Sequence, residues 1–278
     1  MLFPKWHGFG SCVLKHRLMS DKYTLVKGFS SIVSTAIHDG HSTREELKYL
    51  FNLSEEERRR EEDPFTARWL NASDNKIIVH RSRFETDLNR SRDKTVYLNP
   101  EDSWGLKVWK SKLPKEILKS SLAVYDEFYR NVKVYFDRLF TMHEKVIVYD
   151  IHSYNHRRES AGIEADPMEN PEVNLGTRNM DRKLWDPVVQ SLLNHFKKFD
   201  YAGRNLDVRE NVKFKGGYFG QWLFEQYSGK ICPISIEFKK FFMDEYTGEG
   251  FEADIIRIDE MMRLSKMPVL NALKLVNL

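Results

Sequence analysis

Short runs of apolar, β-branched residues alternate along this chain with longer stretches in which apolar residues recur every three or four positions. The short runs predict buried strands, at residues 31–37, 76–80, 145–149 and 231–238. The longer stretches predict amphipathic helices, at residues 113–140, 181–199 and 252–275. Asp181 is the expected cap of the second helix. Because strands alternate with helices, we expect an α/β fold with a central mixed, mostly parallel sheet.

Polar segments connect these elements. Residues 91–112 and 154–172 are predicted to be long loops, and the charged run 55–63 is predicted to be a solvated surface. Other polar residues gather directly after the apolar strands. Ligands of α/β sheets bind at the carboxyl ends of strands, so we expect a functional site there.

Two of the nine histidines, His38 and His152, follow apolar strands directly and have small or acidic neighbours. Imidazole is a common zinc ligand, and a catalytic zinc site needs about three protein ligands and an open position for water. We therefore predict that both histidines bind a metal ion. Asp39 and Asp150 are expected to orient the two rings as hydrogen-bond acceptors.

The sequence offers several candidates for the third metal ligand and does not decide between them. His41 lies three residues after His38, and a loop with this spacing is able to chelate one ion. Asp63 is the competing carboxylate, and Glu45 is a weaker third choice. Glu237 alternates with apolar residues in the strand 231–238, where a carboxylate is costly unless it has a partner or a role. We expect Glu237 to be the base that activates water.

Residues suited to binding an anion follow the strand 76–80, and they are Arg81, Arg83, Asn89 and Arg90. Guanidinium groups bind carboxylates with two hydrogen bonds, so this cluster predicts a clamp for a substrate carboxylate. A second group is Lys215-Gly216-Gly217-Tyr218, whose glycines indicate close approach of the backbone to a neighbour. Lys215 and Tyr218 are expected to face the ligand.

Composition narrows the class of protein. The hydrophobic fraction of 41% and aromatic fraction of 13% support a sizeable core, and 278 residues suit one α/β domain over 1–278. Lys and Arg (44) nearly balance Asp and Glu (41), which disfavours nucleic acid as a partner. The N-terminal residues lack the apolar stretch of a secretory signal, and no apolar run is long enough to span a membrane, so we expect neither a signal nor a membrane span. Cys12 and Cys232 predict no disulfide framework and no thiolate metal site, so we expect a cytoplasmic protein.

Seven short motifs in a fixed order carry a family resemblance, and they are IHDG (37–40), EEDPFTARWL (61–70), SRFETDLNR (82–90), DIHS (150–153), NLGT (174–177), FKGGY (214–218) and SIEF (235–238). The chain resembles the N-formylglutamate amidohydrolases, which in turn resemble the aspartoacylase and zinc-carboxypeptidase group. The motif-bearing core covers about residues 31–245. The resemblance implies a carboxypeptidase-like three-layer α/β/α sandwich and one divalent metal ion, expected to be zinc.

The same resemblance implies hydrolysis of the amide of an N-formyl or N-acyl amino acid, a small anionic substrate. His38 and His152 match metal ligands, and Glu237 matches the glutamate that activates water. The resemblance also implies substrate-binding residues. Asn89 and Arg90 match a pair that holds the substrate carboxylate, Arg83 matches an arginine that polarises the scissile carbonyl, Arg81 competes for that role, and Arg178 directly after NLGT is a further candidate.

One departure concerns the first motif. The aspartoacylase group has glutamate where this chain has His41, so His41 and Asp63 both remain candidates for the third ligand. The alternatives of the same class are a carboxypeptidase-like peptidase and an aspartoacylase-type deacylase. The alternative of a different class is a non-catalytic binding protein that keeps the fold, which the presence of both histidines and Glu237 disfavours.

Overall fold

One mixed sheet organises the protein in the computed structural model, which describes residues 17–277. Its strands lie in the order β1-β2-β4-β3-β5-β8-β6-β7. Their bounds are β1 (Arg17–Met19), β2 (Tyr23–Val26), β3 (Ile32–Ala36), β4 (Asn75–Val79), β5 (Val146–Tyr154), β6 (Val173–Gly176), β7 (Val208–Glu210) and β8 (Ile231–Lys239). The central strands β4, β3, β5 and β8 run parallel, whereas β2 and β6 flank them antiparallel. Four of the seven strand pairs are parallel.

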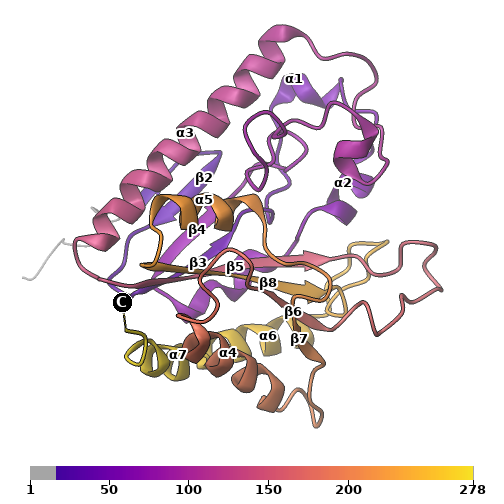
Figure 1. The fold of residues 1–278 in the computed structure, drawn as a ribbon. Helices are drawn as coiled ribbons and strands as arrows, with labels where there is room; N and C mark the ends of the chain where they lie inside the picture. The colour runs from indigo at the N-terminus through magenta and orange to yellow at the C-terminus, as the bar shows by residue number, and fades with distance from the viewer. Residues whose placement is uncertain (1–16, 278) are drawn as a thin grey trace, which may run out of the picture.

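Helices cover both faces of this sheet. Their bounds are α1 (Glu45–Lys48), α2 (Glu55–Glu61), α3 (Lys115–Phe140), α4 (Asp186–Lys198), α5 (Tyr218–Gln226), α6 (Glu252–Leu264) and α7 (Lys266–Leu273), with 3-10 turns η1 (Thr66–Ala72) and η2 (Pro100–Ser103). Figure 1 shows α3 and α5 above the sheet and α4, α6 and α7 below it. This arrangement confirms the predicted α/β sandwich with a mixed sheet.

Two apolar cores lie between the three layers. Above the sheet, α3 packs Phe128, Tyr135 and Phe136 against the strands with no exposed surface. Below the sheet, Trp185 at the start of α4 and Trp69 in η1 are equally buried. Burying such a side chain stabilises a fold by about 1.5–3 kcal/mol, so these cores hold the strand ends in fixed positions.

Three element boundaries differ from the sequence prediction. β5 continues to Tyr154, because its pairing with β8 extends through Tyr154 opposite Lys239. His152 therefore lies within a strand and not after one. α4 begins at Asp186, since Asp181 accepts the amides of Lys183 and Leu184 in a turn before the helix. The C-terminal helix is divided into α6 and α7 at Ser265.

The prediction of a solvated surface over 55–63 is wrong for its second half. α2 begins with a capping box between Ser54 and Glu57, and its first turn is exposed. Glu61, Glu62 and Asp63 are buried. Charge composition alone did not reveal this, because each of these carboxylates has a polar partner supplied by a distant part of the chain.

Cys232 is free and buried in the lower core. Cys12 and the other residues of 1–16, where a secretory signal would begin, lie outside the described residues. Within residues 17–277, none of the helices is long and apolar enough to cross a membrane.

Candidate metal centre and active site

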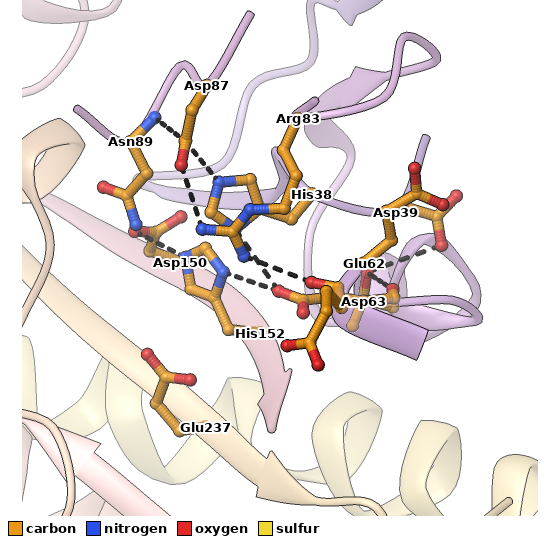
Figure 2. A network of polar contacts seen from close by, with 12 residues as sticks. His38, Asp39, Glu62, Asp63, Arg83, Asp87, Asn89, Asp150, His152 and Glu237 are labelled. Carbon is orange, nitrogen blue, oxygen red and sulfur yellow. Dashed lines mark hydrogen bonds and ion pairs between the residues drawn. The ribbon is translucent and has the colours of Figure 1, made fainter. Parts of the chain in front are cut away.

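Three buried side chains meet at the carboxyl ends of the central strands. His38 follows β3, His152 lies in β5, and Asp63 follows α2. Each offers one ligand atom, and these atoms all lie within 4.8 Å of one another. Asp63 also donates its backbone amide to the carbonyl of His38 at 3.0 Å, which fixes the two segments together. Figure 2 shows the two imidazoles converging on the Asp63 carboxylate.

Both imidazoles present the same nitrogen to Asp63. The Nδ1 atoms of His38 and His152 lie 3.4 and 3.0 Å from one Asp63 oxygen. Their Nε2 atoms point away, toward Asp87 at 2.7 Å and Asp150 at 3.1 Å. A carboxylate that is hydrogen-bonded to one ring nitrogen fixes the tautomer of an imidazole, as Asp87 does for His38, and the Nδ1 atoms of both histidines face the same point.

The acid behind His38 is a correction to the sequence prediction. Asp39, expected in that role, instead accepts the backbone amide of Ala67 at 3.0 Å. Asp87 takes the place behind His38 with a hydrogen bond, and an Asp150 oxygen lies 3.1 Å from the Nε2 atom of His152. Asp39 points away because the chain turns after β3, so adjacency in sequence did not bring it to the ring.

The donor set suits a divalent cation. Burial opposes the charge of Asp63, yet hydrogen bonds from His152 and His38 outweigh it and hold the pKa of that carboxyl below its usual range. Two imidazoles and one carboxylate, buried and convergent, are the protein ligands of catalytic zinc sites, which keep a further position for water. The residues present therefore fit the metal ion that the sequence indicated.

Geometry separates the candidates for the third ligand. Asp63 lies with the two histidines, whereas the His41 ring contacts the Glu62 carboxylate at 2.5 Å. Within the described part of the chain, the group of three does not include His41. Glu45, the weaker choice, pairs with Lys48 on the surface.

Glu237 lies on the strand next to His152, because the two residues are register partners across β5 and β8. Its side chain is buried, and the Ser235 hydroxyl donates to it at 2.9 Å. Burial raises the pKa of Glu237 to about 7. A carboxyl group in this range is able to accept and return a proton near neutral pH.

A cavity of about 170 Å³ is lined by His38, Asp63, His152 and Glu237. Its size is below the 300–1,000 Å³ typical of sites for drug-sized ligands, so it suits a compact molecule. Its acids are Glu61, Asp63 and Glu237. They are outnumbered by cations, namely Arg83, Arg90, Arg158, Lys215 and Lys240. The excess of cationic side chains favours an anionic ligand.

Comparisons with known proteins agree with this geometry. The sequence model of the N-formylglutamate amidohydrolase family matches residues 30–242, most of the chain. The chain belongs to this family. Its fold is similar to the crystal structure of N-formylglutamate amidohydrolase from Ralstonia eutropha JMP134, with a TM-score of 0.69, 16% identity, and coverage of 92% of this chain and 98% of that one.

A second solved structure with a similar fold is a gene product of Agrobacterium tumefaciens, with a TM-score of 0.58, 16% identity, and coverage of 88% of this chain and 92% of that one. A search of curated proteins gave no match. At this identity the two structures establish the fold alone. The family assignment rests on the sequence match, and it confirms the resemblance that the seven motifs indicated.

The family motif SRFETDLNR supplies several side chains of the cavity. Arg83 donates to the Tyr97 hydroxyl at 3.0 Å and to the Asp87 carboxylate at 2.9 Å, which leaves further N–H groups for a ligand. The amide oxygen of Asn89 accepts the backbone N–H of Phe219 at 2.9 Å. Arg90 is more exposed, and its nearest carboxylate is 3.9 Å away.

The FKGGY motif brings backbone against the Asn89 amide, as its glycines predicted. A Cβ atom on Gly217 would lie 2.3 Å from that amide. Gly216 has φ +126°, a conformation that favours glycine. Lys215, exposed and directly before this turn, lines the cavity.

Three substrate-binding candidates lie elsewhere. Among the described residues, the cavity lining does not include Arg81, Arg178 or Tyr218. Arg81 instead pairs with Asp21 and with the buried Glu85. Arg178 is exposed, although its backbone amide bonds to the carbonyl of Lys215. Tyr218 packs toward α3.

Sequence reasoning missed several residues of the cavity wall. Arg158 places one terminal nitrogen 2.7 and 2.9 Å from the two Glu61 oxygens. Its guanidinium group also stacks over Trp104 at 5.5 Å, and Arg83 stacks on the same ring at 4.9 Å. Trp104 and Arg158 come from the two predicted long loops, and the second of these loops is also rich in charged residues.

Proposed function

We propose that this protein is a metal-dependent amidohydrolase that cleaves the amide of a compact, anionic N-formyl or N-acyl amino acid. The observation that carries this proposal is the buried group of His38, Asp63 and His152, with Glu237 beside it in a cationic cavity. Membership of the N-formylglutamate amidohydrolase family supports the same reaction class.

His38, Asp63 and His152 would hold the cation, and their donor types favour zinc. A bound divalent ion supplies a Lewis acid that lowers the pKa of water and polarises a carbonyl. The carboxylates of Asp87 and Asp150 lie beside the two Nε2 atoms, so the Nδ1 atom of each imidazole would face the cation.

Glu237 is proposed to move the proton. It accepts a proton from the attacking water and returns it to the amine nitrogen as the amide bond breaks. Its pKa of about 7, raised by burial, suits both directions of transfer. Arg83 is proposed to donate to the carbonyl oxygen, on which negative charge develops.

Asn89, Arg90 and Lys215 are proposed to hold the substrate carboxylate, since all three line the cavity. This anchoring positions the amide toward the histidines and Glu237, which contributes orientation to catalysis. The small cavity favours a formyl or short acyl group over a peptide. We further propose that zinc is the metal and the cytoplasm the location.

The test is hydrolysis of a panel of substrates by the purified protein, measured as release of formate or of free amino acid. The panel contains N-formyl-glutamate, N-acetyl-aspartate and short peptides, so that amidohydrolase, deacylase and peptidase activities are distinguished. We expect activity on formyl or short acyl amino acids, its loss on chelation and its return with zinc. Full activity after exhaustive chelation, with no metal by elemental analysis, contradicts the proposal.

A further inference from the structure

Lys240 is a buried lysine beside the metal centre that the proposed reaction does not use. It follows β8 directly, three residues after Glu237, and only 2% of its surface is exposed. It lines the same cavity as the two histidines and Asp63. A buried ammonium group is costly unless its protons are bound, so its contacts indicate its role.

The contacts of Lys240 are backbone carbonyls at the end of α2. Its Nζ atom donates to the carbonyl oxygen of Arg60 at 2.6 Å and to that of Glu62 at 2.8 Å. In a continuing helix the carbonyl of Arg60 would accept the amide of residue 64. That residue is Pro64, which has no N–H. Lys240 therefore supplies the donor that the chain itself lacks.

These contacts determine the path of the chain into Asp63. The backbone amide of Asp63 donates to His38, and the carbonyl directly before it accepts from Lys240. The peptide group between Glu62 and Asp63 is thus held from both sides. Its orientation decides where the Asp63 carboxylate points, because a short acidic side chain has few ways to reach the two imidazoles.

The charges around Lys240 partly offset its burial. Burial lowers the pKa of Lys240 to about 8, and the nearby carboxylates of Asp63, Glu61 and Glu245 oppose that shift. A cation at the carboxyl end of a helix is also favourable, since the last carbonyls of the helix carry partial negative charge.

We propose that Lys240 is the positioning residue of Asp63, which holds segment 60–63 so that the carboxylate completes the metal site. This inference rests on the proposed metal-dependent function. It assigns Lys240 an effect on metal affinity, not a contact with substrate.

The test compares Lys240→Met with Lys239→Met. The second variant is a matched control, because Lys239 is the neighbouring lysine and is not among the described residues that line the cavity. Zinc affinity of the metal-free proteins is measured by competition with a chromophoric chelator. Loss of groups that orient metal ligands weakens affinity by about 10–100-fold, so we expect at least a tenfold loss in Lys240→Met and none in Lys239→Met. Kinetics at saturating zinc should show an unchanged KM.

Wild-type zinc affinity in folded Lys240→Met overturns the inference. A raised KM at saturating zinc with unchanged affinity also overturns it, because that result makes Lys240 a substrate contact. If the wild-type protein binds no metal, the proposed function itself fails. Lys240→Gln, which keeps one amide donor, serves if the methionine variant does not fold. We expect an intermediate affinity there, and wild-type affinity counts against the inference.

Discussion

At the scale of single residues, Asp87 serves three functional groups at once. One of its oxygens accepts from the His38 ring at 2.7 Å and from the Asn89 backbone amide at 2.8 Å. The other oxygen accepts from Arg83 at 2.9 Å. These residues are proposed to bind metal, substrate carboxylate and carbonyl oxygen, so one buried carboxylate aligns all three.

We therefore expect Asp87→Asn to weaken zinc binding by about 10–100-fold, because the amide cannot hold the His38 ring and Arg83 as an anion does. Zinc affinity by chelator competition and kcat/KM measure the effect. Asp126→Asn is the control, since Asp126 is a partly exposed residue of α3 that pairs with Arg92. Equal zinc affinity in the two variants contradicts this role of Asp87.

Replacing Glu237 tests the proton transfer. Glu237→Gln keeps the size of the side chain but cannot accept a proton, so kcat should fall by about 10²–10⁴-fold. Zinc content should stay at the wild-type level, because Glu237 is not in the group of three convergent ligands. An active, zinc-loaded glutamine variant removes Glu237 from the mechanism.

The sequence predicted some of these residues and not others for a physical reason. His38, His152 and Glu237 are polar residues in or beside apolar strands, and the neighbouring residues in the sequence are enough to show this pattern. Asp87 and Lys240 act through side chains that meet distant partners, and nothing in their local sequence indicates which partner that is. Asp63 was identified only as one of two candidates, because its place in the site depends on how α2 packs.

At the scale of elements, the turn before α5 and the loop carrying Asn89 hold each other. Phe219 donates its amide to Asn89, and Gly217 allows the close approach. The proposed substrate clamp is therefore a junction between two segments, and its shape depends on the absence of a side chain at Gly217.

Gly217→Ala should raise KM by about tenfold or more, because its methyl group displaces the Asn89 amide, and each 1.4 kcal/mol of lost binding is a factor of ten. Zinc affinity should be unchanged. Gly162→Ala is the control, since a Cβ atom at Gly162 meets nothing within 4 Å. A wild-type KM in Gly217→Ala shows that the Asn89 amide does not bind the substrate.

Elements were predicted well where burial and periodicity coincide, as in α3 and the four central strands. Boundaries were missed where pairing overrides composition. β5 extends over polar residues to Tyr154 because β8 offers backbone partners along its whole length. The second half of 55–63 is buried because ion pairs from other elements neutralise its acids, which charge composition does not reveal.

At the scale of the whole molecule, the site buries ionisable side chains, Glu237 among them, at the centre of the sheet. Burial raises the pKa of Glu237 from 4.5 to about 7. Between these values the folded protein retains a proton that the unfolded chain releases. The free energy of unfolding of the metal-free protein should therefore fall as pH rises from about 4.5 to about 7.

This fall corresponds to about 3 kcal/mol, from the difference between the two pKa values. Urea unfolding of the metal-free protein at a series of pH values measures it. Glu237→Gln should lack this part of the slope, and the difference between the two proteins isolates it from other titrating groups. Parallel pH profiles for the two proteins contradict the buried, protonated state of Glu237.

The candidate metal centre joins parts of the chain that are far apart in sequence, since Asp63 and His152 differ by 89 in residue number. We expect such a contact to form late in folding, since closing a long loop costs entropy before any interaction offsets that cost. Zinc should then slow unfolding and leave the rate of refolding nearly unchanged. Stopped-flow measurements with and without zinc test this, and a large acceleration of refolding contradicts it. A bound ion would then make the native state kinetically more stable without guiding the chain to it.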